Sequence, residues 1–432
     1  MPDIISFNPW IGLGQYPDPE ESSNKYLFCG RDREIKDIYD LIDDNIFVTI
    51  YGKSGIGKSS ILKAGVFPVL RDNRYLPIIV RLWMDARGIS FQDCIIDAVN
   101  AAIKNKGYIQ TQDIIPLSSD KTEDDYFWRY FARTSFKSFD GKTLFPVIVL
   151  DQFEEVLREK SGEAEILLRQ IDFLADTSHV YNISGGILDG YEYDYNYRFV
   201  SVIREDDLDR LEDVIDNNFL PKLKQGRFRL RNLTDSGARE VVLKPAKGLF
   251  REEAKKEIVD TILELSKADN DGVVSSQILS LVCNRMFRVY QQKEEPYITL
   301  DLVKSFVNEN PLRTVYFEIV SKLPFRQRKY LERNLVDSSG RRNFISFNDF
   351  KDNIPDGMYL LGGDTQILVQ TTISSRTGDS CVELIHDSFC DVVKWENEKE
   401  RQGSKRASFI ILLIVSLLMI PFIILFFYSL LS

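Results

Sequence analysis

The chain has 432 residues, 44% hydrophobic and 28% charged, a composition typical of a globular protein with room for two to four domains. Its net charge of −10 argues against broad nucleic-acid binding, which needs a basic surface. Five widely spaced cysteines without a CxxC pair argue against a disulfide framework, and two histidines argue against a histidine-rich metal site.

The first segment, residues 1–45, is irregular around Asn8-Pro9-Trp10 and later enters a helix that we expect to end near Ile42. Before this helix, Phe28, Gly30 and Arg31 form a turn of the kind that can build a nucleotide-base pocket. An ordinary loop packed on the edge of a sheet explains these residues equally well. The residues alone leave both interpretations open.

An apolar run, residues 46–51, leads into a phosphate-binding motif. Residues 52–59 fit G-x-x-x-x-G-K-[ST], in which backbone N–H groups surround an anion at the start of a helix. In this motif the lysine, Lys58, reaches the β- and γ-phosphates, and the hydroxyl of Ser59 ligates Mg²⁺. A glycine-rich turn is the alternative, but the expected strand before it and the expected helix after it, from Ser59 to about Gly65, favour the motif. We therefore expect ATP or ADP with Mg²⁺ at Gly52, Ser54, Gly55, Gly57, Lys58, Ser59 and Ser60.

Apolar strands alternate with helical patterns over residues 46–232, which we expect to form an α/β P-loop NTPase domain with a parallel sheet covered on both faces. Alternating tyrosines suggest a hairpin or extended insertion at residues 182–197. Beyond the P-loop, the periodicity predicts strands at 77–82, 145–150, 199–203 and 228–230, and helices at 91–104 and 121–136.

Acidic residues follow the strand at 145–150. Asp151 has the position of a Walker B aspartate on a strand that we expect beside the P-loop strand, where it can hold Mg²⁺. Either Glu154 or Glu155 could polarise the attacking water, although solvated acids at the start of a helix are the alternative. Because Gln152 and not a carboxylate follows the aspartate, we expect slow or regulated ATP hydrolysis.

Arg204 ends the expected strand at 199–203. At that sheet edge an arginine can contact a γ-phosphate. A surface ion pair is the alternative, and position alone does not separate the two.

The rest of the chain is helical before it becomes mixed. We expect a helical domain at 233–309 and a winged-helix domain at 310–400, in which strands at 366–373 and 380–385 form the wing. His386, after the second of these strands, could face a neighbouring domain or be an ordinary core histidine. The expected helices are residues 236–242, 252–266, 276–290, 311–335 and 387–400.

The C-terminal segment has a different composition. Residues 409–431 are apolar and free of charge, which is long enough to cross ~30 Å of hydrocarbon as a helix. A basic linker, residues 401–408, precedes this run, and by the positive-inside rule it keeps the soluble body in the cytoplasm. We expect a single-pass membrane protein held by its C-terminal tail.

Together these blocks resemble the STAND class of signal-transducing P-loop NTPases, in particular the bacterial novel STAND branch. The resemblance implies an ADP/ATP switch that is closed with ADP, and open and homo-oligomeric with ATP. It also implies that Arg204 is similar to the family's sensor arginine, and His386 to the winged-helix histidine that contacts the ADP β-phosphate and locks the closed state. The matching blocks are residues 8–13, 28–34, 52–60, 149–155, 204–206, 244–246 and 383–389.

We therefore expect a membrane-anchored ATP/ADP switch that assembles in the ATP state, with bacterial defence as one conceivable output. Its protein trigger is unknown, since we expect neither a repeat array nor a catalytic effector domain after the winged helix. Two other classes compete. Fast basal ATPase activity would favour a continuously cycling remodelling ATPase, and phosphate transfer to an acceptor other than water would favour a P-loop kinase.

Overall fold

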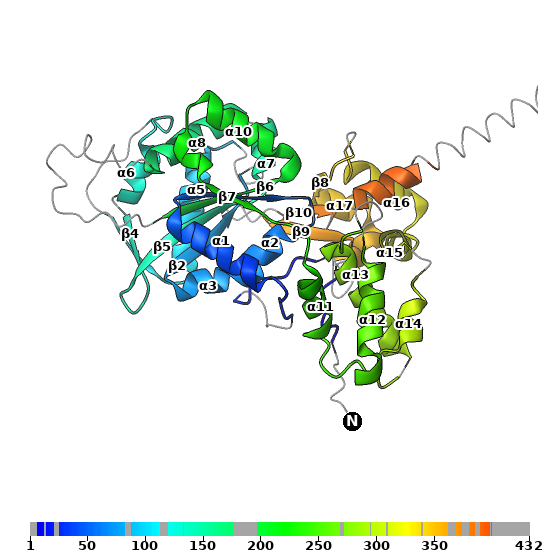
Figure 1. Ribbon diagram of the computed structural model, residues 1–432. Helices are drawn as coiled ribbons and strands as arrows, with labels where there is room; N and C mark the ends of the chain where they lie inside the picture. Colours follow the sequence, from blue (N-terminus) through cyan, green and yellow to red (C-terminus); the bar gives the residue numbers. More distant parts are fainter. Residues whose placement is uncertain are drawn as a thin grey trace, which may run out of the picture. The chain divides into compact units, whose positions relative to one another are not determined.

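The structure is a computed structural model, and its helices and strands are labelled in Figure 1. The chain separates into two compact units. One unit contains residues 1–311 and 371–381, and the other contains residues 312–370 and 382–432. The structure describes residues 7–12, 14–20, 26–82, 88–112, 120–132, 134–159, 161–175, 197–267, 272–293, 295–307, 310–337, 340–361, 368–373, 380–384, 389–397 and 399.

The first unit is built on a seven-stranded sheet. Its strands are β1 (Phe47–Gly52), β2 (Tyr75–Val80), β3 (Ile109–Gln112), β4 (Thr134–Lys137), β5 (Thr143–Leu150), β6 (Arg198–Arg204) and β7 (Gly226–Arg229). Helix α1 (Asp32–Asp44) precedes β1. The helices between the strands are α2 (Lys58–Ser60), the π-helix η1 (Ile61–Val66), α3 (Phe67–Asp72), α5 (Phe91–Asn105), α6 (Tyr126–Ala132), α7 (Phe153–Glu159), α8 (Ser161–Ala175), the 3₁₀ turn η2 (Glu205–Asp207), α10 (Leu208–Asn217) and the 3₁₀ turn η3 (Pro221–Lys224).

The sheet is mixed, which corrects the expectation of a parallel sheet. Five strands are parallel, in the order β2-β5-β6-β1-β7, and β4 and β3 extend the sheet antiparallel from β5. The expectation that Asp151 follows a strand beside the P-loop strand is also wrong, because β6 lies between β5 and β1. A sequence pattern identifies strands but not their lateral order, which depends on how the crossover helices pack.

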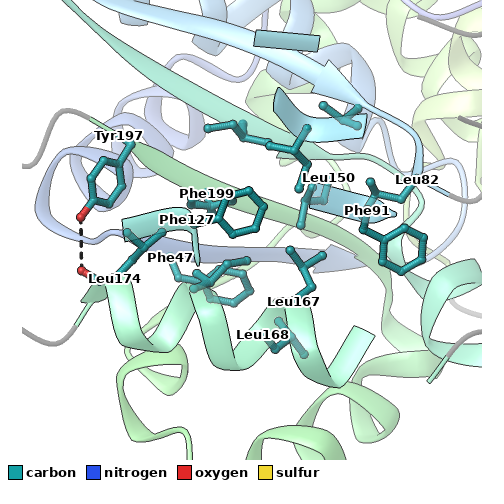
Figure 2. Close-up of a cluster of buried hydrophobic side chains, with 14 of the residues drawn as sticks. Phe47, Leu82, Phe91, Phe127, Leu150, Leu167, Leu168, Leu174, Tyr197 and Phe199 are labelled. Atoms are coloured by element: carbon teal, nitrogen blue, oxygen red, sulfur yellow. Dashed lines mark hydrogen bonds between the residues drawn. The ribbon is translucent and has the colours of Figure 1, made fainter. Parts of the chain in front are cut away.

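The continuous apolar runs of the parallel strands are explained by burial of both faces. In β1, Phe47 faces a core with α5, α6, α8 and α10, while Val48 and Ile50 face a second core with α1 and α3. Figure 2 shows the first core, in which Phe199 of β6 packs with Phe127 and the hydroxyl of Tyr197 donates to the backbone oxygen of Leu174 at 3.4 Å.

Two helix boundaries differ from the predictions. The helix expected at 121–136 ends at Ala132, because Thr134 bonds through its hydroxyl to the backbone oxygen of Tyr130 at 2.7 Å and then enters β4. The helix after the P-loop continues through η1 and α3 to Asp72. The insertion expected at 182–197 lies outside the described residues except for Tyr197.

A helical bundle completes the described core of the first unit. Three of its helices are close to the predicted ones: α11 (Asp235–Leu243), α12 (Glu252–Leu265) and α13 (Ser276–Gln292). The fourth, α14 (Leu300–Lys304), was not predicted as a separate helix. Trp10 is fully buried in this bundle and its indole N–H donates to the backbone oxygen of Val241 at 2.9 Å. The irregular N-terminal stretch is therefore an integral part of the bundle core.

From residue 311 onward the chain contains helices and a small sheet of order β8-β10-β9, and the boundary between the two units falls within β9 and within β10. The helix predicted at 311–335 is divided in two at Pro324, as expected for a residue that cannot continue a helix. A further helical stretch covers residues 389–397. The other elements are α15 (Pro311–Val320), α16 (Phe325–Asn334), β8 (Phe344–Ser346), α17 (Phe347–Asn353), the 3₁₀ segment η4 (Pro355–Leu361), β9 (Val369–Ile373) and β10 (Ser380–Leu384).

Two further predictions fall on segments that the structure does not describe. His386 and the apolar run 409–431 both lie outside the described residues. In the part of the chain that is described, no helix is both long enough and apolar enough to span a bilayer.

Candidate functional site

The carboxyl ends of four parallel strands bring the candidate residues to one edge of the sheet. In the ladder between β1 and β6, Gly52 lies opposite Arg204. Across the neighbouring ladder, Val80 of β2 lies opposite Leu150 of β5, so Arg81 and Asp151 leave the sheet together. Open α/β sheets bind ligands at this kind of edge.

The loop after β1 has the backbone of an anion-binding loop. Gly55 and Gly57 have φ of 70° and 102°, in the region that favours glycine. A Cβ at Gly57 would meet no atom within 4 Å, so this position faces open space. A Cβ at Gly52 would lie 2.6 Å from the backbone oxygen of Leu230, so the first glycine is needed for packing against the segment after β7.

The P-loop lysine folds back on its own loop. Nζ of Lys58 donates to the backbone oxygens of Gly52 at 2.8 Å and Lys53 at 3.1 Å. Ser60 lies two residues after Lys58, and its hydroxyl oxygen accepts a hydrogen bond from the backbone N–H of Tyr16 at 3.2 Å. The loop is therefore also tied to the N-terminal stretch.

Of the residues proposed for a base pocket, Arg31 contacts the P-loop, while Gly30 and Phe28 pack against other segments. Arg31 is buried, and its guanidinium donates to the backbone oxygens of Ile56 at 3.2 Å and Arg231 at 2.7 Å. Gly30 has φ 79°, and a Cβ there would lie 2.3 Å from the backbone oxygen of Gly237. Phe28 packs edge-on against Tyr16, with ring centroids 5.2 Å apart. These contacts favour the packing-loop alternative for Arg31 and Gly30.

Asp151 is a buried carboxylate surrounded by cations. Arg81 donates from Nε at 3.1 Å and from Nη2 at 3.0 Å, both to Oδ2. Burial acts to raise the pKa of Asp151, but Arg81, Lys63 and Lys58 outweigh burial and hold this pKa below its ordinary value. The carboxylate is therefore ionised, as a Mg²⁺ ligand must be.

The two glutamates of α7 have different environments. Glu155 pairs with Nη1 of Arg158 at 2.9 Å, which occupies it in an ion pair. Glu154 is 6% exposed, and among the described residues its Oε2 has no hydrogen-bond partner. Burial raises the pKa of Glu154 to about 7, against the opposing field of Lys58. A carboxylate poised near neutral pH beside the P-loop lysine is suited to be a general base.

Arg204 forms an ion pair, one of the two alternatives that the sequence left open. Its Nη2 lies 3.6 Å from Oδ2 of Asp206, so an ion pair is present. Its register opposite Gly52 nevertheless places it at the start of the P-loop. Its contact with a γ-phosphate stays a prediction.

The sequence interpretation missed three residues at this site. Arg81 directly follows β2 as Asp151 follows β5, but the strand predicted at 77–82 contained Arg81 and hid this position. From α13, Gln277 donates to the backbone oxygen of Ser54 at 3.0 Å, and the hydroxyl of Ser276 lies 3.3 Å from the backbone oxygen of Ile56. No sequence signal connects α13 to the P-loop, because they are more than two hundred residues apart.

The residues present fit a nucleotide with its Mg²⁺. The open space at Gly57 and the start of a helix suit a phosphate group. The hydroxyl of Ser59 and the ionised Asp151 are the hard oxygen ligands that Mg²⁺ prefers when it arrives with phosphate oxygens.

Comparison with known proteins gives one family. The model of the family described as "Novel STAND NTPase 1" matches residues 9–304. No curated protein matches the chain.

Distant likenesses exist among solved structures. Cdc6p from Pyrobaculum aerophilum is 13% identical, with 86% of this chain and 94% of that chain covered and a TM-score of 0.38. The ORC2 protein of Aeropyrum pernix, in ADPNP-ADP complexes, is 13% identical, with coverages of 90% and 100% and a TM-score of 0.43. The Walker-type ATPase paby2304 of Pyrococcus abyssi is 10% identical, with coverages of 89% and 99% and a TM-score of 0.41. At these TM-scores the family match carries the assignment.

Proposed function

The chain belongs to the novel STAND NTPase 1 family, and from this premise we propose that it is an ATP/ADP-dependent switch with slow, regulated hydrolysis. The observation that carries the proposal is the meeting of the P-loop, Asp151 and Arg204 at one edge of the sheet. These groups can bind phosphates, hold a metal and sense the γ-phosphate.

Each group has a role in this proposal. The backbone of residues 52–60 and Nζ of Lys58 bind the phosphates, and a bound Mg²⁺, held by Ser59 and Asp151, would neutralise charge that develops on them. Glu154 takes a proton from the attacking water, while Glu155 stays paired with Arg158. Hydrolysis is slow in this proposal because Gln152, and not a second carboxylate, follows Asp151.

The switch itself requires the second unit. We place a winged-helix domain at residues 310–400, after a helical domain at 233–309. The described elements within 310–400 are the sheet β8-β10-β9 and helices α15, α16 and α17. In the proposal His386 contacts the β-phosphate of ADP and holds the closed state. Exchange of ADP for ATP releases this contact and exposes surfaces for homo-oligomer assembly.

Membrane attachment completes the proposal. Residues 409–431 form a single-pass helix behind the basic linker 401–408 and keep the body in the cytoplasm. Assembly in the ATP state would gather several tails in one membrane patch, an output suited to bacterial defence.

The test is to purify the full chain in detergent, identify the bound nucleotide, and measure mass by light scattering before and after exchange of ADP for ATP. We expect ADP with a monomer and ATP with a larger homo-oligomer. A mass that is independent of nucleotide would exclude the switch. Fast basal hydrolysis would instead indicate a remodelling ATPase, and phosphate transfer to an acceptor other than water a kinase.

A further inference from the structure

Arg81 binds one oxygen of Asp151, the carboxylate that we propose as a ligand of the metal. Its side chain is 13% exposed and that of Asp151 is 6% exposed, so the pair is largely shielded from water. Both donor nitrogens, Nε and Nη2, point at Oδ2 of Asp151. The guanidinium is thus fixed in orientation by two hydrogen bonds to one oxygen.

A Mg²⁺ ion and this guanidinium cannot both use Asp151 without cost. A carboxylate oxygen that accepts two charge-assisted hydrogen bonds has little capacity left for a metal or for a metal-bound water. Two cations close together in a shielded site also repel each other more strongly than they would in water. The second oxygen, Oδ1, keeps lone pairs that a metal can use, so a metal binds beside Arg81 only against this repulsion and binds more tightly once Arg81 leaves Oδ2.

Together with two lysines, Arg81 can also supply the positive charge that a metal would bring to the phosphates. The positive field at Asp151 comes from Arg81, Lys63 and Lys58, and the latter two lie on the P-loop helix. This concentration of charge favours phosphate groups at the adjacent loop even when no metal is present.

We propose that Arg81 competes with Mg²⁺ for Asp151, so that the site binds nucleotide with little dependence on Mg²⁺ until Arg81 is displaced. Arg81 is a positioning residue in this proposal, which rests on the nucleotide site proposed above. Its consequence is a nucleotide state that does not require metal and a metal-dependent state that is reached only when the ion pair opens.

The experiment measures binding of ADP and of ATP to the full-length protein by calorimetry, first in EDTA and then over a series of Mg²⁺ concentrations. For the wild type we expect similar ADP affinity in EDTA and in low Mg²⁺. In Arg81→Gln we expect weaker ADP binding in EDTA and a Mg²⁺ concentration for half-saturation that is lower by roughly tenfold, the effect of removing one charge-assisted partner. Equal Mg²⁺ dependence in wild type and Arg81→Gln would overturn the proposal.

Two further variants keep the result interpretable. Arg71→Gln removes a comparable shielded pair, since Arg71 donates to buried Asp18 at 2.8 Å, and should leave the Mg²⁺ dependence unchanged. Arg81→Lys keeps the charge but changes the donor geometry. It should lower the Mg²⁺ concentration for half-saturation as Arg81→Gln does, but by a smaller factor. If Arg81→Gln does not fold, as judged by its melting curve, an unchanged Mg²⁺ dependence in Arg81→Lys overturns the proposal. Absence of nucleotide binding by the wild type would instead refute the proposed function and leave no site for this competition.

Discussion

Nε2 of Gln277 donates to the backbone oxygen of Ser54 at 3.0 Å, so the first turn of α13 holds the P-loop from outside. Arg31 and Ser276 act in the same way on the backbone oxygen of Ile56. In each trans peptide unit the C=O of one residue and the N–H of the next point in opposite directions. A loop carbonyl that is hydrogen-bonded from outside therefore leaves the following N–H facing the phosphate position. The helical bundle thereby shapes the nucleotide site.

Gln277→Glu tests this support. The substitution keeps the size of the side chain but places an acceptor against the Ser54 carbonyl and a negative charge near the phosphates. We expect nucleotide affinity to fall by roughly tenfold, the effect of a lost hydrogen bond plus repulsion. Gln292→Glu, at the exposed end of the same helix, is the control and should bind normally. Normal binding by Gln277→Glu would mean that the contact does not shape the loop.

Lys58→Ala should strongly weaken binding of both ATP and ADP. The variant loses the cation that leaves the backbone oxygens of Gly52 and Lys53 to reach the β- and γ-phosphates. Lys53→Ala removes an exposed lysine from the same loop and controls for a general change in charge. Binding is measured by calorimetry, and unchanged affinity in Lys58→Ala would remove the P-loop assignment.

Hydrolysis should depend on pH through Glu154. With a pKa of about 7, the carboxylate is about one tenth ionised at pH 6 and about nine tenths at pH 8, so the single-turnover rate should rise several-fold over this range. Glu154→Gln should reduce the rate by roughly 100-fold or more and abolish the dependence. Glu155→Gln should retain it, and a wild-type rate that is flat between pH 6 and 8 would contradict the assignment.

The same group affects stability in a defined direction. The pKa of Glu154 is higher in the folded chain than in the unfolded chain, so the folded state binds more protons between these two values. The free energy of unfolding should therefore fall as pH rises from about 4.5 to about 7. In Glu154→Gln this part of the pH dependence should disappear, which denaturant titration at several pH values would measure.

His386→Ala should shift the population toward the open, ATP-like form. Loss of one charge-assisted hydrogen bond to the ADP β-phosphate is worth ~1.5–3 kcal/mol, which changes a marginal equilibrium by roughly tenfold or more. The rate of ADP release, followed with a fluorescent analogue, should increase. An unchanged release rate, or simple unfolding, would support an ordinary core histidine.

The C-terminal run contains Pro421, which frees a backbone carbonyl that lipid cannot satisfy and that neighbouring helices can. We therefore expect the tails to associate within the bilayer, so replacing residues 409–431 with an unrelated single-pass anchor of equal length should abolish signalling or toxicity. Survival of the response after this exchange would show that the tail is only an anchor and that another protein is the effector.

The sequence by itself determined the features that depend on local chemistry. Residues 52–59 form the phosphate loop because glycine conformation and helix initiation are local properties, and the strands before Asp151 and Arg204 follow from apolar runs that need two covered faces. The family resemblance, which rested on these blocks, is confirmed by the match over residues 9–304.

Only the tertiary structure decided which residues share an environment. It placed β6 between β1 and β5, joined Arg81 to Asp151, and brought Gln277 to Ser54. It also separated Glu154 from its neighbour Glu155, because one is buried beside Lys58 and the other reaches Arg158. The burial of Glu154 and the contacts of Arg81 and Gln277 depend on segments that are distant in the chain, and residue spacing carries no record of them. The pair of Glu155 and Arg158 is local, because the two residues lie three positions apart on α7.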